Sequence, residues 1–462
     1  MKYILNPKIA LRSWTLVPHA YYVKGEEFAK GLKREEFELL LACDGKTDLP
    51  GSPLLEELQR KELIIPCVEE KELSEWQRYR HCENRYFPKI NWMITGKCNY
   101  NCLHCFNAAD NAPLMSEWSL EEAKRLLDEA QLCGINSFTV TGGEPMLHPN
   151  FFELMEEIYR RDMFVDELNT NGYFINQQTL ERMKDLGCRA MIKISFDGIG
   201  HHDWLRNRRG AQEDALRAIR LCVDNGFRVM VQTNVHRKNV DSMLETAKLL
   251  DAAGVDSMRI IRTTEAPRWV QNAGNACLEL TEYYDHMADL VSRYIKTDCK
   301  MRMIIWQYMF VHPHSRSYSL IPVQYDERTY RDTLPVCKGN RGMVAVAANG
   351  NVFPCHQLSG YYEQHKDILG NVKTGSLQKL LQESAYLDEV CTTVDKVREH
   401  DQKCSACRFF LYCAGGCRAI ALALTGDKLA ADPSKCIFFT GGYYEKALKA
   451  MEDYYNLSPM QL

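Results

Sequence analysis

The chain has 462 residues, of which 45% are hydrophobic, and a formal net charge of -4. This length is enough for about three domains, and the nearly balanced charge predicts no nucleic-acid partner, because binding to phosphates needs a concentrated positive field. The first residues lack a basic segment followed by an apolar run, and no apolar run approaches the roughly 20 residues that span a bilayer. We therefore expect a cytoplasmic protein with no membrane partner.

The chain contains 19 cysteines, which is more than an ordinary cytosolic enzyme carries. Disulfides are rare in a reducing compartment, so cysteines in tight patterns are expected to be metal ligands. Nine of them are isolated along the chain, and most of these are expected to be small core residues. The other ten fall into two closely spaced groups.

The pattern of residues 1–85 predicts a small α/β unit. The expected strands are Trp14–Val17, Tyr21–Lys24 and Leu63–Ile65. The expected helices are Lys33–Cys43, which Asp44-Gly45 ends, and Pro53–Arg60. The charged stretch Glu69–Arg80 follows as a candidate linker.

From residue 91 onwards, apolar strand candidates alternate with helical segments. The expected strands are Asn91–Thr95, Ser137–Thr141, Val165–Asn169, Ala190–Ser195, Arg228–Thr233 and Ser257–Ile261. The helices between them are one that Ser119 and Glu122 cap, Leu180–Leu186, Ala211–Asn225 and Val240–Ala253. This alternation predicts an α/β fold in which residues 86–310 form a partial (β/α)6 barrel, with the chemistry in the loops that follow the strands.

The alternation fades after about residue 310. Met343–Ala347 and Asn351–Pro354, joined by Asn349-Gly350, predict a hairpin. We expect a cysteine-rich domain over residues 311–440 and a C-terminal helix within residues 441–462.

The first cysteine group directly follows the first barrel strand. Its sequence is Cys98-Asn-Tyr-Asn-Cys102-Leu-His-Cys105. Three thiolates at this spacing can hold three irons of a [4Fe–4S] cluster and leave the fourth iron open. Zinc is the alternative, but structural zinc usually takes four ligands, and His104 would supply the fourth only with awkward geometry.

This motif at this place resembles the radical S-adenosylmethionine (SAM) superfamily. In that family the open iron holds the amino and carboxylate groups of SAM. One electron cleaves the sulfonium to give methionine and a 5′-deoxyadenosyl radical, which abstracts hydrogen from an unactivated carbon. The resemblance implies an external one-electron reductant of the flavodoxin or ferredoxin type.

The loop after the second strand strengthens the resemblance. Its sequence is Thr141-Gly142-Gly143-Glu144-Pro145. This segment resembles the family's GGEP motif, whose backbone and Glu hold the SAM amine. Glycines there let the backbone approach a ligand closely. A GGEP sequence alone is most often a turn, so its place after the second strand carries the argument.

Residues near two other strands match the same pattern. Thr170-Asn171-Gly172 ends the third strand, and Ser195 ends the fourth, with Arg206 shortly after it. By resemblance, Ser195 and Arg206 contact the ribose and carboxylate of SAM, and Arg suits a carboxylate because its fork is bidentate. The resemblance also places His104 near the adenine. Separately, Ser195 also fits a turn cap and Arg206 a solvated charge.

The second cysteine group lies near the C-terminus. Its members are Cys337, Cys355, Cys404, Cys407, Cys413, Cys417 and Cys436. Cys404 and Cys407 alone would fit a zinc knuckle. The whole set resembles the SPASM domain of radical enzymes that modify peptides, which holds two auxiliary [4Fe–4S] clusters and implies three clusters in all. The family pairing gives Cys337, Cys355 and Cys417 to auxiliary cluster I, and Cys404, Cys407, Cys413 and Cys436 to auxiliary cluster II.

The chain departs from this family in two places. Some members carry an eighth cysteine shortly before the first, whereas Tyr325–Val336 contains none. Cluster I is therefore expected to keep an open iron for a substrate thiolate, unless distant Cys299 closes the site. Sulfatase-maturing members place an Asp base after the equivalent of Cys355, where this chain has His356, so a sulfatase-maturase-like activity is the weaker alternative.

The N-terminal unit resembles the small winged-helix-like element fused to many peptide maturases. Such elements bind the leader of a precursor peptide as an added strand on a sheet edge. A structural cap on the barrel is the alternative.

The leading hypothesis is a radical SAM maturase of ribosomally made peptides (RiPPs) that forms a thioether or related crosslink. Cys413–Pro433 also resembles tetrapyrrole-modifying radical enzymes of haem synthesis, and Arg259, Arg262 and Arg268 could receive an anionic tetrapyrrole. A small substrate needs no leader-binding unit, however. A non-enzymatic electron-transfer protein is the third hypothesis. The sequence identifies no catalytic acid or base.

Overall fold

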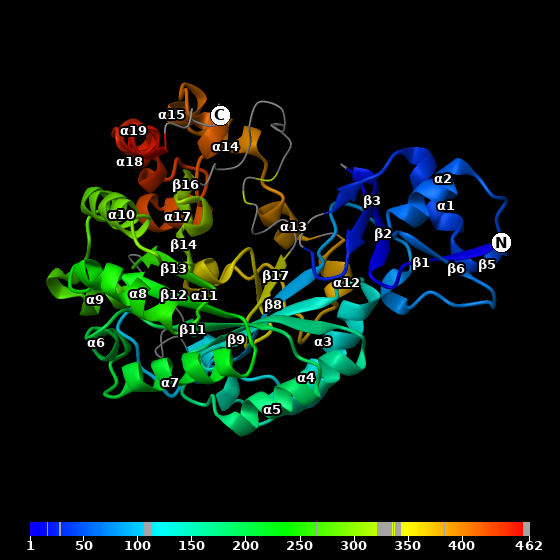
Figure 1. The fold of residues 1–462 in the computed structure, drawn as a ribbon, viewed down its shortest axis with the longest axis horizontal. Coiled ribbons are helices and arrows are strands. Elements are labelled where there is room, and N and C mark those ends of the chain that lie inside the picture. Colours follow the sequence, from blue (N-terminus) through cyan, green and yellow to red (C-terminus); the bar gives the residue numbers. More distant parts are fainter. Residues whose placement is uncertain are drawn as a thin grey trace.

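The computed structural model describes most of the chain. The described residues are 1–15, 17–26, 29–105, 112–263, 267–320, 335, 337, 343–382 and 384–455. One sheet of eleven strands forms the body, and two small sheets form an N-terminal lobe that stands at one side of it, opposite the C-terminal helices (Figure 1). No helix in the described part of the chain is long and apolar enough to cross a bilayer.

Seven consecutive strands of the large sheet pair in parallel and in chain order. They are β8 (Lys89–Thr95), β9 (Ser137–Gly142), β10 (Phe164–Thr170), β11 (Met191–Ser195), β12 (Val229–Val235), β13 (Ser257–Arg262) and β14 (Arg302–Ile305). This confirms the predicted partial-barrel fold. β14 is a strand that the sequence did not predict, because its four residues are too few to show a strand pattern.

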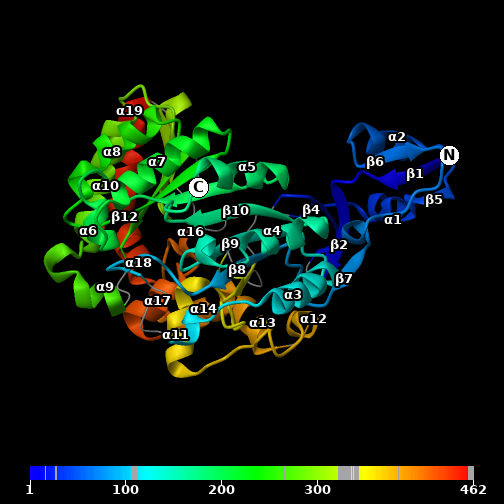
Figure 2. The ribbon, with the colours of Figure 1, turned by 90° about the horizontal axis from the view of Figure 1, so that it is seen from below.

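Helices cover the outer face of this parallel sheet. They are α3 (Leu120–Leu132), α4 (Phe151–Arg160), α5 (Gln177–Asp185), α7 (Ala211–Asp224), α8 (Met243–Ala252) and α10 (Leu280–Tyr294). In Figure 2, α4 and α5 lie beside β9 and β10. Alternate residues of β8 explain the arrangement: Ile90, Trp92 and Ile94 are buried in the core, and Lys89 and Asn91 point to the other face. The strand therefore has an apolar and a polar face.

The polar face carries a network of buried charges. The Lys89 ammonium lies 2.5 Å from Asp166, and the Lys193 ammonium lies 2.6 Å from Glu167. Burial raises the pKa of Asp166 to about 6. Burial also acts on Glu167, but the Lys193 and Lys89 charges outweigh it and lower the pKa of that carboxyl to about 2. Buried charges persist only when they are paired, so this network fixes the neighbouring strands in register.

Both edges of the sheet extend beyond the parallel strands. β15 (Met309–His312) and β16 (Ser317–Leu320) continue it antiparallel from β14. At the other edge, β17 (Met343–Val346) pairs in parallel with β8 and antiparallel with β18 (Val352–Phe353). The predicted hairpin is therefore present, and Gly350 has the positive φ of 87° that its turn requires. Through β17, the cysteine-rich region shares the sheet of the barrel.

The N-terminal lobe contains more strands than the sequence predicts. They are β1 (Lys2–Leu5), β2 (Ile9–Trp14), β3 (Val17–Val23), β4 (Lys30–Gly31), β5 (Asp44–Asp48), β6 (Ile64–Cys67) and β7 (Arg80–Cys82). The two expected helices are present as α1 (Arg34–Ala42) and α2 (Pro53–Arg60). Asp44-Gly45 does follow α1, but the chain goes on as β5, whose polar sequence gave no strand signal. The lobe has its own core around Phe37, Leu40, Leu55 and Leu58.

The expected linker is folded onto both the lobe and the barrel. Arg12 in β2 is fully buried and donates hydrogen bonds to the carbonyls of Trp76 (2.7 Å) and Arg78 (3.0 Å). Arg80 in β7 donates to the carbonyls of Leu132 (2.9 Å) and Gln131 (3.2 Å) at the end of α3. A helix C-terminus carries partial negative charge, so a guanidinium there attaches the lobe to the barrel.

The C-terminal region is a series of short helices that pack on the barrel. They include α11 (Ser359–His365), α12 (Leu377–Leu380), α13 (Ala385–Val390), α14 (Val394–His400), α15 (Gln402–Ser405), α16 (Phe410–Cys413), α17 (Arg418–Thr425), α18 (Pro433–Thr440) and α19 (Tyr443–Tyr455). The predicted terminal helix corresponds to α19, which lies beside α18, α10 and β16.

We expect Arg12→Ala to destabilise the lobe by about 3 kcal/mol, because it removes charged hydrogen bonds to buried carbonyls. Denaturant unfolding and limited proteolysis near residues 68–80 measure the effect. The matched control is Arg34→Ala. Arg34 pairs with Glu38 at the surface, its side chain is 77% exposed, and its loss should change stability by less than about 0.5 kcal/mol. Equal effects of the two variants would contradict the attachment.

Candidate functional site

The loops after β8 and β9 are joined through their backbones. The Gly143 amide donates to Thr95 O at 2.8 Å, and the Glu144 amide donates to Lys97 O at 2.8 Å. A Cβ atom on Gly143 would lie only 2.2 Å from Lys97 O, so only glycine allows this approach. The predicted GGEP loop therefore contacts the loop that carries Cys98, Cys102 and Cys105.

Glu144 is fully buried at the centre of this site. Its carboxylate accepts hydrogen bonds from the Thr170 hydroxyl (2.8 Å) and from the amides of Asn171 (2.8 Å) and Met146 (3.3 Å). Burial nevertheless raises the pKa of Glu144 to about 7, and none of the groups that perturb it is a cation. A buried carboxyl held by amides and a hydroxyl fits a ligand that brings its own positive charge, as SAM does.

The loop after β10 completes this side of the site. Asn171 donates its side-chain amide to Asn99 Oδ1 at 2.8 Å and lies 4.0 Å from the Cys98 sulfur. Thr170 and Asn171, which the sequence analysis placed at this pocket without a role, thus connect Glu144 to the cysteine loop.

The three thiols of the first group are neighbours. Desolvation raises the pKa of the Cys98 thiol to about 12, and the nearby Glu144, Cys102 and Cys105 add to the rise. Buried thiols this close together lose their protons readily only when a cation or an iron–sulfur cluster takes the place of those protons. The set is suited to cluster ligation.

Arg206, on the short helix α6 (His202–Arg206), lies against the same cluster loop. Its guanidinium donates to Asp197 at 2.7 and 3.1 Å and reaches the Cys102 sulfur at 3.8 Å. Asp197 is fully buried, and it also accepts from the Asn234 amide at 2.9 Å. The charges of Arg206 and, more weakly, His202 outweigh burial and lower the pKa of Asp197 far below its usual range.

Asp197 is the clearest residue that sequence reasoning left without a role, although it lies between two predicted site residues. Ser195 is at the end of β11, where the sequence predicted it. His104 has a buried Nδ1 with no hydrogen-bond partner among the described atoms, and burial lowers its pKa to about 3. The imidazole is therefore neutral, which is compatible with stacking on a base.

The second cysteine group separates into two sets of neighbouring thiols. Burial, then Cys417 and Cys337, raise the pKa of the Cys355 thiol to about 12. In the other set, burial raises the pKa of Cys404 to about 12, with Cys436 and Cys407 among its neighbours. Cys413 has Cys436 and Cys404 beside it, and its pKa is raised as well. These sets have the same members as the two predicted clusters.

Cys299 does not approach the first of these sets. Its thiol lies near Thr297, Asp251 and Lys248, just before β14 begins. At the other end of β14, the side chain of Gln307 reaches Cys417. Cys299 and Cys417 are thus at opposite ends of the strand, so distant Cys299 does not close the site.

His356 follows Cys355 and is buried. Its Nε2 lies 3.1 Å from Asn91 O, and burial lowers its pKa to about 4. A histidine with so low a pKa is a weak base at neutral pH. This disfavours the role that Asp has in sulfatase maturation.

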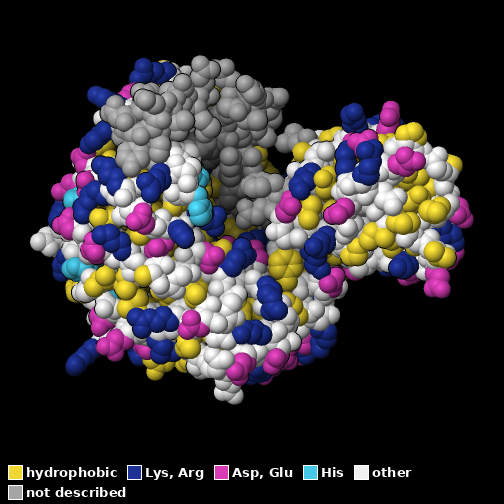
Figure 3. Space-filling model, viewed as in Figure 1, with side chains coloured by type: hydrophobic (Ala, Val, Ile, Leu, Met, Phe, Trp, Pro, Cys, Tyr) yellow, Lys and Arg dark blue, Asp and Glu magenta, His cyan; other side chains and the backbone are white. Residues whose placement is uncertain are grey.

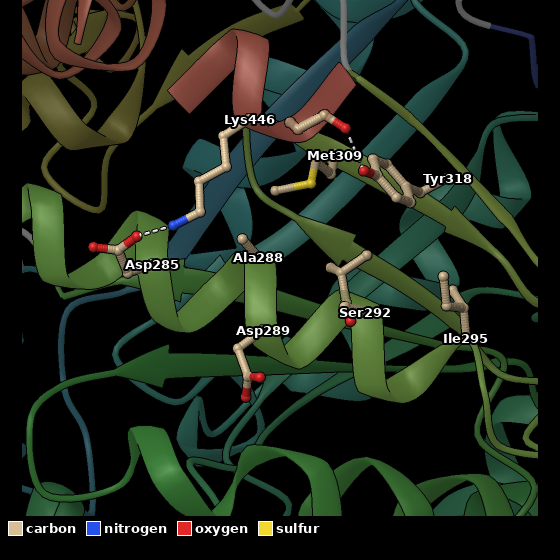
Figure 4. A pocket seen from close by; sticks show the side chains of 10 residues that line it. Asp285, Ala288, Asp289, Ser292, Ile295, Met309, Tyr318 and Lys446 are labelled. Atoms are coloured by element: carbon tan, nitrogen blue, oxygen red, sulfur yellow. Dashed lines mark hydrogen bonds and ion pairs between the residues drawn. The ribbon is translucent and has the colours of Figure 1, made fainter. Parts of the chain in front are cut away.

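A cavity of about 320 Å³ lies between α10, β15, β16 and α19 (Figure 4). Asp285, Asp289, Met309, Tyr318 and Lys446 line it, and it contains none of the candidate site residues.

On the face shown in Figure 3, Lys and Arg side chains are interspersed with Asp and Glu. Among the described residues, no three His, Cys, Asp or Glu side chains converge closely enough to hold a single metal ion.

Two family models match the chain. The model of the radical SAM superfamily matches residues 92–250, and a model of an iron–sulfur cluster-binding domain, SPASM, matches residues 337–408. The chain belongs to the radical SAM superfamily. It is an enzyme with a SPASM domain. Members of the radical SAM superfamily use SAM together with iron–sulfur clusters. The resemblance predicted from the two cysteine groups is confirmed.

Curated relatives of this radical SAM protein fall into two groups. An AdoMet-dependent heme synthase of Nitratidesulfovibrio vulgaris is 28% identical, over 74% of this chain and 90% of that protein. A PqqA peptide cyclase of Granulibacter bethesdensis is 25% identical, over 78% of this chain and 90% of that protein. Among solved structures, Streptococcus suis SuiB bound to its precursor peptide SuiA matches with a TM-score of 0.67 at 12% identity, over 93% of this chain and 98% of that one. This last likeness shows the fold.

We expect Asp197→Asn to destabilise this radical SAM protein by about 3–5 kcal/mol, because it leaves the Arg206 guanidinium buried without an anion. Chemical denaturation of wild type and variant measures the loss. Asp241→Asn is the control: that side chain is 88% exposed and lies 3.7 Å from His286, so its replacement should be close to neutral. A neutral Asp197→Asn would show that the pair does not support the site.

Proposed function

We propose that this protein is a radical SAM maturase of a ribosomally made peptide, and that it forms a thioether or a related crosslink. In this proposal it binds three [4Fe–4S] clusters through the three thiol sets described above. When bound, SAM on the first cluster supplies the 5′-deoxyadenosyl radical after one electron arrives from a flavodoxin- or ferredoxin-type reductant.

The residues around the first cluster have assigned tasks in this proposal. Glu144 receives the SAM amine, with the backbone of Gly142, Gly143 and Pro145 beside it. Ser195 and Arg206 are proposed to contact the ribose and carboxylate, and His104 the adenine. The uncompensated buried carboxyl of Glu144 supports its task most directly.

The thiol set of Cys337, Cys355 and Cys417 is the observation that carries the proposed reaction. It offers three ligands to a cluster that takes four, and Cys299 lies at the far end of β14. A substrate thiolate is proposed to complete the set. The sulfur would then be held beside the carbon radical, and one electron would pass to the cluster when the C–S bond forms.

The N-terminal lobe supports a peptide substrate. The match to SuiB leaves only about 7% of this chain uncovered, which is less than the lobe, so that fold extends into the lobe. A leader peptide is proposed to add a strand to an edge of the lobe.

The heme-synthase relatives make a tetrapyrrole substrate the second candidate. Three arginines were predicted to receive its carboxylates, and each has a partner within the chain. Arg259 stacks on Trp306 at 4.4 Å, Arg262 donates to Leu278 O at 3.0 Å, and Arg268 donates to Asn101. This engagement favours the peptide over the tetrapyrrole.

One experiment separates the two candidates. Anaerobically reconstituted, reduced protein is given SAM with either a cysteine-containing peptide encoded beside the gene or an iron-coproporphyrin. We expect 5′-deoxyadenosine and a peptide 2 Da lighter by mass spectrometry, with no change in the porphyrin. A modified porphyrin and an unchanged peptide would overturn the proposal in favour of the second candidate.

Glu144 gives the SAM site a predicted pH dependence. Because its pKa is raised to about 7, the carboxyl is largely protonated at pH 6 and ionised at pH 8. Only the ionised form accepts from the amine and attracts the sulfonium, so we expect SAM affinity to rise about tenfold between these pH values. Calorimetry on the cluster-loaded protein measures it.

Two variants control for titration of SAM itself. Glu144→Gln should weaken binding and remove the part of the pH dependence that belongs to this carboxyl. Glu153→Gln, at an exposed position of α4, should bind as wild type at each pH. A Glu144→Gln profile parallel to that of wild type would contradict the assignment.

The outer strand β6 provides a test of leader binding. Ile65 on this strand is 39% exposed, and Val68 just after it is fully exposed. We expect Val68→Asp to weaken binding of the full-length precursor about tenfold, measured by fluorescence anisotropy, and to leave binding of a leaderless peptide unchanged. Glu72→Lys, at an exposed position near the same segment, is the control for charge change. Unaltered precursor binding by Val68→Asp would count against this edge.

A further inference from the structure

The first cysteine loop has a second side, which faces α7 and has no task in the proposed SAM site. Tyr100 lies between Cys98 and Cys102 in the chain, and its amide donates to the Cys98 sulfur at 3.4 Å. The Tyr100 side chain packs in a small cluster with Cys102, Cys105 and Ala211, the first residue of α7. Tyr100 therefore covers the first thiol set on the side of α7.

A second tyrosine continues this cover to the surface. The ring centres of Tyr100 and Tyr173 are 6.5 Å apart, and 38% of Tyr173 is exposed. The Arg208 guanidinium lies over both rings, 4.9 Å from the centre of Tyr100 and 4.4 Å from that of Tyr173. Two aromatic rings thus lead from the thiols to solvent on this side.

Other sides of the loop pack against the protein. The Leu103 amide donates to Leu205 O at 2.9 Å, and the Leu103 side chain packs on a core cluster that contains Leu205 and Trp269. Towards β9, the Glu144 amide holds Lys97 O. Among the described residues, the Tyr173 side is therefore an approach from solvent to the first thiol set.

Positive charge is concentrated around the two rings. Residues 206–220 contain five arginines and two acidic residues, whereas the whole chain has a net charge of -4. Arg206 is buried against Asp197, as described above. The other four arginines are partly or fully exposed: Arg208, Arg209, Arg217 and Arg220.

The local acid does not cancel this charge. Asp214 lies 3.8 Å from the Arg208 guanidinium and 3.4 Å from that of Arg217, so two arginines share one carboxylate. Arg217 also donates to Tyr173 O at 3.1 Å, which attaches α7 to the exposed ring. Arg220 is one turn further along α7, on the same side of the helix as Arg217. The face is therefore continuous and basic.

We infer that this surface, the Tyr173 face (Tyr173, Arg208, Arg209, Arg217 and Arg220), docks an acidic one-electron carrier protein of the flavodoxin or ferredoxin type. The carrier passes one electron directly to the first cluster and is itself oxidised by one electron, and no bond forms or breaks in this step. The inference rests on the proposed function, which requires that electron. Entry through auxiliary cluster II is the competing route.

The chemistry of the Tyr173 face fits such a partner. A positive patch on a protein of negative net charge attracts and orients an acidic partner, and it raises the rate of encounter. Tyr and Arg are the residues that contribute most at the centres of interfaces. Transient electron-transfer complexes bury less than about 1,200 Å², so one loop and one side of a helix are sufficient.

The two routes start from different parts of the molecule. In Figure 1, α6 and α7 lie at the lower left, and α14 and α15 lie at the top. Cys404, a member of the thiol set assigned to auxiliary cluster II, is on α15. Charge changes near α7 and near α14 therefore distinguish docking on the Tyr173 face from docking at auxiliary cluster II.

The test measures binding first. Arg209→Glu combined with Arg220→Glu reverses two exposed charges and leaves Tyr100 and Arg208 in place. The cluster-loaded protein is titrated by calorimetry with an oxidised acidic flavodoxin and, separately, with an oxidised acidic ferredoxin. We expect at least one carrier to bind wild type, with an affinity that falls as salt is added, and to bind the double variant about tenfold more weakly.

Two further double variants control for shape and for net charge. Arg209→Lys with Arg220→Lys keeps both charges, so affinity should stay within about threefold of wild type. Lys379→Glu with Lys396→Glu changes the net charge as much as the arginine reversals do. These lysines are exposed on α12 and α14, away from the Tyr173 face, and their reversal should leave carrier binding unchanged.

Reduction provides a second measurement. With a limiting amount of reduced carrier, formation of 5′-deoxyadenosine should be about tenfold slower in the arginine-to-glutamate variant than in wild type. With dithionite, a small reductant that needs no protein docking surface, the two rates should be equal. A loss with dithionite as well would show damage to the SAM site and would overturn the docking role.

The binding results can also overturn the inference. It fails if neither carrier binds wild type, or if the arginine reversals leave affinity unchanged. It fails as well if the lysine reversals weaken binding equally or alone, and a loss in the lysine variant alone would place entry at auxiliary cluster II. The proposed function is judged separately: dithionite-reduced wild type that forms no 5′-deoxyadenosine contradicts it, while calorimetry still decides the docking site.

Discussion

The parallel pairing of β17 with β8 is the constraint on which the arrangement of this protein depends. β8 leads directly into the loop with Cys98, and β17 belongs to the hairpin that leads into Cys355. The return strand β18 runs antiparallel to β17, so the chain turns back along the pair before it reaches Cys355, and His356 Nε2 lies 3.1 Å from Asn91 O of β8. The pairing therefore attaches the segment with Cys355 to the strand that precedes the first thiol set. The Trp118 indole strengthens this junction by donating to Ala347 O at 3.1 Å.

Around the first thiol set, the structure buries charges that water would otherwise screen. Among the described residues, none of the groups that act on Glu144 is a cation, whereas Asp197 holds Arg206 in a bidentate pair. The pKa of Glu144 is consequently raised, which favours its protonated form. The pKa of Asp197 is lowered, which keeps it ionised. Such a site is open to a cationic ligand at Glu144 and already satisfied at Asp197. Fixed dipoles and charges in a dry pocket also need little rearrangement when a ligand enters.

The second thiol set faces the barrel through the β14–β15 turn, where three parts of the chain meet. β14 carries the turn to the site, α18 supplies Lys435, and the helical segments after Cys355 and Cys417 supply the opposite wall. A substrate bound there would touch the barrel and the cysteine-rich region at once. Because the N-terminal lobe is attached to α3 through Arg80, its sheet edges also have a fixed place relative to the barrel. This geometry is suited to a substrate held at two separate points.

The sequence alone determined the class of the protein. CxxxCxxC after a strand and GGEP after the next strand are local patterns, because ligand spacing within a loop is a property of the chain itself. The division of the seven later cysteines into two sets came from the family resemblance, since members such as Cys337 and Cys417 are far apart in the chain. The partial barrel also followed from local periodicity. Short or polar elements such as β5 and β14 did not, because a few residues carry too little pattern. Only the tertiary structure decided that Cys299 lies away from Cys417, that Asp197 compensates Arg206, and that Gln307 has a positive φ in the turn after β14. These facts depend on contacts between residues about ten to more than a hundred positions apart, on burial and on the φ angle that packing imposes, none of which is written in the order of the residues.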